Sequence, residues 1–195
     1  MLTALEPAER SKEFAEMALA EILDARAINR RALGAEPLYT TYVDGNANAA
    51  LESVKPNGVI FVEFQLITEV LAFIGQQLEM FSPVKTGRYK RSHVLLADGI
   101  AMELDTPAML AQLAIAEEYV FVNTVPYARK IERGMSPQAP DGVYQAVANI
   151  ARTRYSKIAR ITFSYRTIVG GLMIGGREGD RSEKRNPAVI VRIGK

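Results

Sequence analysis

The chain contains no cysteine and no tryptophan, and His93 is its only histidine. Without cysteine it can form no disulfide framework, no thiolate zinc site and no thiol nucleophile. A metal or acid–base site built on histidine needs partners, so we expect His93 to be an ordinary strand residue. The residues therefore indicate no catalytic residue, no cofactor site and no metal site.

Long apolar runs and a strong charge of one sign are missing as well. No stretch approaches the roughly 18 apolar residues of a membrane span, and the N-terminal residues do not resemble a signal peptide. We expect a soluble protein made in the cytoplasm, without a membrane partner. The 195 residues carry 24 basic and 22 acidic side chains, a balance too even to indicate a polyanion partner from bulk charge.

Sequence signatures of nucleotide binding and acyl transfer fail on spacing. The glycines of 170–176 match neither a dinucleotide fingerprint nor a phosphate-binding loop. Ser82-x-x-Lys85 and Lys85-Thr86-Gly87 match two boxes of serine acyl-transferases, but here both boxes share one lysine. Since those boxes come from different elements in a real site, we reject this interpretation.

Hydrophobic periodicity predicts three long helices, over 6–33, 66–81 and 142–157, with Asp141 as the cap of the last one. The apolar stripe expected to be buried in the first helix contains Phe14, Met17, Ala18, Ile22, Ala25 and Ile28. Alternating or β-branched runs predict strands near 38–43, 58–64, 92–104 (a pair about Asp98-Gly99), 118–125, 160–169 and 188–195, and a shorter helix is expected over 106–118.

The order of these elements is typical of an α+β fold, not of a regular βαβ alternation. We predict a single domain over 1–195 in which long helices pack on a small antiparallel β-sheet. Within it, 35–64 is expected to be a β-rich, hairpin-like insertion, and 175–186 a mobile charged loop.

Basic side chains cluster at three places, and contact with phosphate is one interpretation of each cluster. Solvated faces or ion pairs are the alternative, because the net charge is nearly balanced. The clusters are Lys85, Arg88, Lys90 and Arg91; Arg152, Arg154, Lys157 and Arg160; and Arg177, Arg181, Lys184 and Arg185.

Two segments carry a family resemblance. "SPVKTGRYKRS", residues 82–92, follows a predicted amphipathic helix, and "VNTVPYARKIERGMSPQAPDGVYQAVANIAR", residues 122–152, joins a strand, a Pro-bearing loop and a helix. Their order and spacing resemble the tail-completion and head–tail connector (neck) proteins of tailed bacteriophages, the group typified by gene product 10 of phage HK97. The resemblance covers about 66–160, roughly half of the chain.

This resemblance implies a structural virion protein, not an enzyme, that forms a homo-oligomeric ring, a hexamer or dodecamer, at the head–tail junction. Its partners would be portal or adaptor proteins, tail terminator or tail tube proteins, and genomic double-stranded DNA passing through the lumen. Which layer of the neck the protein would occupy, adaptor, tail completion or terminator, stays open, because the segments 35–64 and 175–186 depart from the family pattern. The positions that match its motifs are Pro83, Thr86, Gly87, Ser92, Tyr127, Glu132 and Gly134.

Elementary chemistry suggests what several motif residues do. Pro83 would end the preceding helix, and Gly87 would take a positive φ where the chain reverses. Thr86 would bond backbone left unpaired at the helix end. Tyr127 would bury its ring, and Glu132 would pair with a basic residue such as Arg88.

Three alternative functions would each require other features of the sequence. A nucleic-acid-binding protein acting alone would use the basic clusters and show a steep dependence on salt. A hydrolase would need a convergent polar cleft that the sequence does not indicate. No residue pattern favours a toxin–antitoxin or host-factor module.

Overall fold

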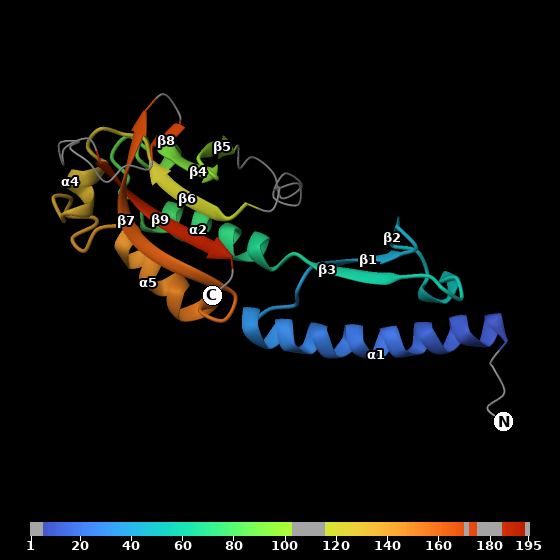
Figure 1. The fold of residues 1–195 in the computed structure, drawn as a ribbon. Coiled ribbons are helices and arrows are strands. Elements are labelled where there is room, and N and C mark those ends of the chain that lie inside the picture. The colour runs from blue at the N-terminus through green and yellow to red at the C-terminus, as the bar shows by residue number, and fades with distance from the viewer. Residues whose placement is uncertain (1–5, 103–115, 170–171, 175–184, 194–195) are drawn as a thin grey trace. The chain divides into compact units, whose positions relative to one another are not determined.

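A computed structural model describes residues 6–102, 116–169, 172–174 and 185–193 (Figure 1). Its helices and antiparallel sheets confirm the predicted α+β class. The chain divides into two compact units, residues 1–66 and 67–195, where the sequence suggested one domain. The segment 35–64 does not interrupt the larger unit, because it packs with the first helix around a small core of its own.

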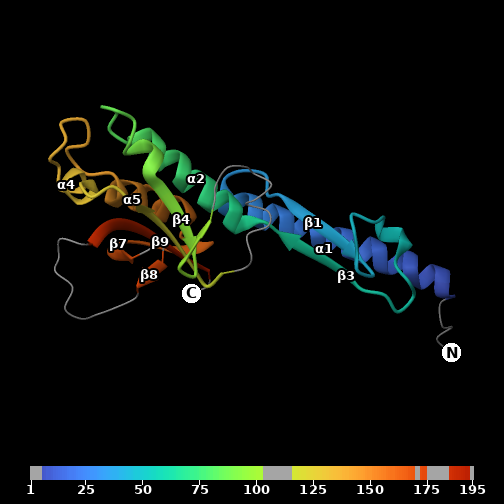
Figure 2. The ribbon, with the colours of Figure 1, turned by 90° about the horizontal axis from the view of Figure 1, so that it is seen from above.

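Unit 1 combines one long helix with a small sheet (Figures 1 and 2). The helix begins with Pro7 in its first turn and ends at Gly34, whose N–H donates to Arg30 O. Three antiparallel strands form the sheet in the order β2-β1-β3. The elements are α1 (Pro7–Leu33), β1 (Tyr39–Val43), β2 (Asn46–Ala47), the 3-10 turn η1 (Leu51–Ser53) and β3 (Ile60–Phe64).

The core of unit 1 is small and differs from the predicted one. Ala15, Val43 and Val54 form its buried cluster. Ile22 is buried as predicted, whereas Phe14, Met17 and Ile28 are exposed. Periodicity identified apolar positions on α1 correctly, but the sheet covers only one flank of the helix.

Unit 2 is built on a six-stranded antiparallel sheet, ordered β5-β4-β6-β9-β7-β8. Its two edge strands contact each other, so the sheet is strongly curled. The elements are α2 (Leu66–Phe81), η2 (Lys90–Ser92), β4 (His93–Ala97), β5 (Ile100–Met102), β6 (Glu118–Asn123), α4 (Ala128–Glu132), α5 (Tyr144–Tyr155), β7 (Ala159–Val169), β8 (Leu172–Ile174) and β9 (Arg185–Ile193).

Two helices cover one face of this sheet. Gly75 of α2 lies over the ring of Phe121, and Phe73 of α2 meets Tyr155 of α5 edge to face at 5.3 Å. The strand alternation turns a second apolar cluster to the other face. That cluster comprises Leu96, Val120, Val122, Ala188 and Ile190.

The predicted ends of several elements can be compared with the structure. Helix 66–81 and the hairpin about Asp98-Gly99 are confirmed. The last strand begins at Arg185, so residues 185–186 of the expected mobile loop are strand. Most of that loop, and residues 106–115 of the predicted short helix, lie outside the described residues. None of the helices in the described ranges is long and apolar enough to cross a membrane.

Candidate functional site

The two segments that carry the family resemblance fold against each other in unit 2. The buried Asn123 side chain donates to Tyr89 O at 2.8 Å, and Thr124 N donates to Ser92 O at 3.0 Å. Farther along, Val84 N donates to Gln138 Oε1 at 2.6 Å. Residues distant in sequence thus form one hydrogen-bonded junction.

A groove of about 800 Å³ opens at this junction, and we call it the motif groove. Its walls are largely apolar or aromatic, with Tyr127, Ile131 and Pro137 facing the loop of 83–89. Lys85 and Arg88 also line it; both are exposed, and neither forms an ion pair with a described residue. Since no carboxylate lines the groove, it favours a ligand that combines apolar surface with negative charge.

Glu132 does not form the predicted ion pair; it caps a helix instead. Its buried carboxylate accepts the backbone N–H groups of Val143, Tyr144 and Gln145 at 3.1, 2.9 and 2.8 Å. These are the unpaired donors at the start of α5, where the helix dipole also favours an anion. Asp141, the predicted cap, is exposed, and the N-cap position is Val143.

Gly142 makes room for this cap. Its φ is +78°, and a Cβ there would lie 2.7 Å from Glu132 O and 2.9 Å from Glu132 Oε1. A side chain at 142 would therefore strain the backbone and push the carboxylate away from the helix. The sequence alone does not reveal this role, because the carboxylate comes from α4.

Other motif residues partly follow the predictions. α2 ends immediately before Ser82-Pro83, and Gly87 has the expected positive φ of 73°. In the last turn of α2, the carbonyl of Leu78 accepts from the Ser82 hydroxyl at 2.5 Å. Thr86 Oγ1 accepts from Arg88 N, outside the helix, and not from the helix end as predicted. Tyr127 does not bury its ring; it is 36% exposed and lines the groove.

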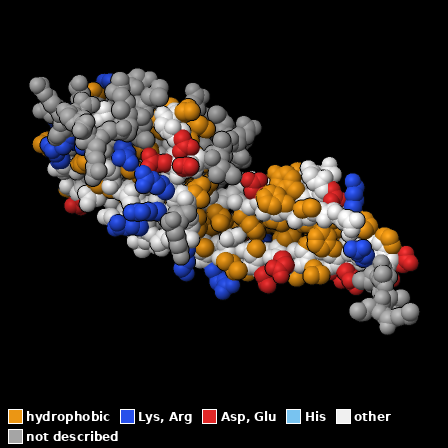
Figure 3. Space-filling model, viewed as in Figure 1, with side chains coloured by type: hydrophobic (Ala, Val, Ile, Leu, Met, Phe, Trp, Pro, Cys, Tyr) orange, Lys and Arg blue, Asp and Glu red, His pale blue; other side chains and the backbone are white. Residues whose placement is uncertain are grey.

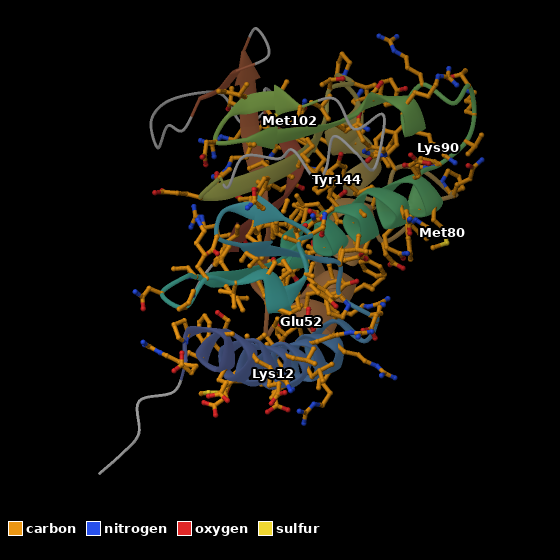
Figure 4. All side chains as sticks on the ribbon, turned by 90° about the vertical axis from the view of Figure 1, so that its right-hand side faces the viewer. Lys12, Glu52, Met80, Lys90, Met102 and Tyr144 are labelled. Atoms are coloured by element: carbon orange, nitrogen blue, oxygen red, sulfur yellow. The ribbon has the colours of Figure 1, made fainter. Side chains whose placement is uncertain are left out.

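His93 joins the junction through a chain of side-chain hydrogen bonds. Its Nε2 lies 2.7 Å from Ser82 Oγ, and its Nδ1 lies 2.7 Å from the hydroxyl of Tyr144. The amide nitrogen of Asn123 is 3.3 Å from the same Nδ1. Figure 4 shows Tyr144 inside unit 2, near α2 and the strands.

The directions of these hydrogen bonds indicate that the network stabilises the fold and does not activate Ser82. The Ser82 proton goes to Leu78 O, so the imidazole donates from Nε2 to Ser82 and accepts at Nδ1 from Tyr144. Burial lowers the pKa of His93 to about 4, which keeps the ring neutral. Ser82 is buried and its hydroxyl proton is committed, so this pair does not present an activated nucleophile.

The three predicted basic clusters differ in the structure. In the first, Lys90 lies 3.8 Å from Glu79, and Arg91 donates to Thr86 O. In the third, Arg177, Arg181 and Lys184 lie outside the described residues, while Arg185 is a half-buried strand residue.

The second cluster surrounds a hollow of about 530 Å³ between the end of α5 and the start of β7. Arg152, Lys157 and Arg160 line it, and all three are exposed. We call these three residues the basic corner. Arg154 lies apart from them, with its guanidinium 4.7 Å from the ring centre of Phe73. Figure 3 shows Lys and Arg side chains gathered on part of unit 2.

The described residues contain no group of acidic or histidine side chains arranged to hold a metal ion. No family model, no curated protein and no solved structure matches the chain. The assignment of function therefore depends on the motif junction, the groove and the distribution of charge.

Proposed function

We propose that this protein is a structural component of a tailed-phage neck and forms a closed ring between the head and the tail. The observation that carries the proposal is the junction of residues 82–92 with 122–152. The two segments that resemble neck proteins form one unit held by Asn123, Thr124 and Gln138. In this function the junction is a scaffold that holds the motif groove in shape.

A ring of identical subunits needs two different complementary surfaces on each subunit. The chain offers an exposed apolar surface on unit 1 and a cation-lined groove on unit 2, which differ in position and chemistry. Portal or adaptor proteins on one side and tail proteins on the other are the proposed further partners. The role is mechanical and requires no catalytic residue.

Contact with the passing DNA is assigned to the basic corner. Its three exposed cations have no carboxylate beside them among the described residues that line the hollow, so they are available to contact phosphates without reading sequence. Such contact should be weak, because DNA must move through the lumen. A protein that functions by binding nucleic acid alone would instead bind duplex tightly as a monomer.

Replacing Arg152, Lys157 and Arg160 together by alanine should weaken duplex binding and reduce the slope of log affinity against log salt by about 2–3. The reason is the loss of up to one released counterion for each lost phosphate contact. Fluorescence anisotropy with a short duplex at about 50–200 mM salt measures this slope. Alanine at Arg10, Lys12 and Lys55 of unit 1 is the matched control, and equal slopes for both triple variants would contradict the assignment.

The neck function itself is tested by disrupting the gene in the phage or prophage that carries it. We expect DNA-filled heads and separate tails, with function restored by the intact gene. In normal particles, a labelled antibody against the chain should bind at the head–tail junction. Fully infectious particles that lack the protein would refute the proposed function.

A further inference from the structure

One flank of α1 carries apolar side chains that the sheet of unit 1 does not cover. Phe14, Met17 and Ile28 are 40%, 68% and 60% exposed. Steps of three and four residues place them on the same flank as Glu21 and Asp24, which are also exposed. We call these five residues the α1 ridge, and Figure 3 shows exposed apolar side chains over unit 1.

Charge is divided unevenly between the two units. Residues 1–66 contain six basic and ten acidic side chains, a net charge of −4. Residues 67–195 contain eighteen basic and twelve acidic side chains, a net charge of +6. The near-neutral net charge of the chain is therefore the sum of an acidic unit 1 and a basic unit 2. Unit 1 of one copy is attracted to unit 2 of another copy.

The motif groove has the volume of a binding site and complements the α1 ridge in chemistry. Its volume of about 800 Å³ lies within the usual range of binding pockets, about 300–1,000 Å³. Tyr127, Ile131 and Pro137 offer apolar contact, and Lys85 and Arg88 are two cations that have no described carboxylate partner. The basic corner is a poorer match, because its hollow has no aromatic wall.

We propose that the α1 ridge of one copy binds the motif groove of a second copy, head to tail. Phe14, Met17 or Ile28 enters between the apolar walls, as an amphipathic helix does in a groove. Glu21 and Asp24 then lie opposite Lys85 and Arg88. The contact uses two different surfaces, so it can repeat around a closed ring. It deepens the proposed neck function by naming the subunit interface.

The absence of cysteine permits a direct test with full-length chains, each carrying one new cysteine. Met17→Cys marks the α1 ridge, and Val84→Cys marks the groove, where Val84 is 60% exposed. A mixture of the two chains under mild oxidation should form the mixed disulfide about tenfold faster than either chain forms its own, because docking raises the local concentration. Leu23→Cys, 50% exposed on another flank of α1, is the control in place of Met17→Cys.

Charge reversal distinguishes docking from random collision. Adding Glu21→Lys and Asp24→Lys to the Met17→Cys chain should lower the rate of mixed-disulfide formation to that of the Leu23→Cys control, because like charges would then face each other. Adding Lys85→Glu and Arg88→Glu to the Val84→Cys chain should restore the faster formation of the mixed disulfide, because the charges are again opposite.

Three results would overturn the proposed interface. They are equal rates for Met17→Cys and Leu23→Cys, a dominant disulfide between two Met17→Cys chains, and, in an additional chain that carries both Met17→Cys and Val84→Cys, a disulfide that forms only within the chain. If any of these occurred while gene disruption still separated heads from tails, the interface would be wrong and the neck function would stand. A fast mixed disulfide together with no effect of gene disruption would support the interface and refute the neck function.

Discussion

Replacing Glu132 by alanine should lower the free energy of unfolding of unit 2 by about 3–4 kcal/mol, the largest effect we expect from a single substitution. The carboxylate accepts three N–H groups at the start of α5 and is buried. Alanine would leave those donors without this partner, two of them at the buried residues Val143 and Tyr144, and would remove the anion that the helix terminus favours. Glu132→Gln, which keeps one acceptor oxygen, should have an intermediate effect.

Asp141→Ala is the matched control. Asp141 lies next to the same helix start, but it is exposed and does not cap α5, so alanine should change the free energy by less than about 0.5 kcal/mol. Denaturant unfolding followed by circular dichroism measures both variants. Amide hydrogen exchange at Val143, Tyr144 and Gln145 then locates the loss. Equal destabilisation by the two substitutions would refute the capping role of Glu132.

Acidification should destabilise unit 2 through His93 by up to about 3 kcal/mol between pH 6.5 and pH 4. Burial lowers the pKa of His93 from 6.5 to about 4, so the unfolded chain binds the proton first. The contribution to stability is therefore complete above pH 6.5 and is lost as the pH falls. Protonation would also place an N–H at Nδ1, which in the neutral ring accepts from Tyr144.

Because the chain has a single histidine, its ring gives an unambiguous NMR signal for this titration. We expect a pKa near 4 in the folded protein. His93→Gln should remove the histidine part of the pH dependence, while the acidic side chains titrate alike in both proteins. A His93 pKa close to 6.5, or an unchanged pH slope in the variant, would contradict the neutral, buried network.

Local signals predicted much of the fold. Ser82-Pro83 fixed the end of α2, because proline disfavours helix at the residue before it, and the Asp98-Gly99 hairpin followed from its turn residues. The α5 cap was predicted wrongly because a local residue, Asp141, satisfies the usual pattern. The true cap, Glu132, comes from another helix, and only the tertiary fold brings it close.

The same limit applies to burial and to the candidate site. Periodicity on α1 showed where the apolar side chains lie, but could not show that the small sheet leaves Phe14, Met17 and Ile28 exposed. The motif groove depends on residues 83–89 meeting residues 127–138, which spacing alone does not reveal. Opposite net charges in the two units were present in the sequence, but they become visible only once the boundary at residue 66 is known.

Native mass measurement of the full chain over a concentration series, with and without a short duplex, tests the central claim most directly. We predict a discrete ring, a hexamer or dodecamer, that forms without DNA and adds no further subunits at higher concentration. A chain that stays monomeric at every concentration and changes mass only when duplex is present would contradict the ring, and would identify nucleic-acid binding as its primary function.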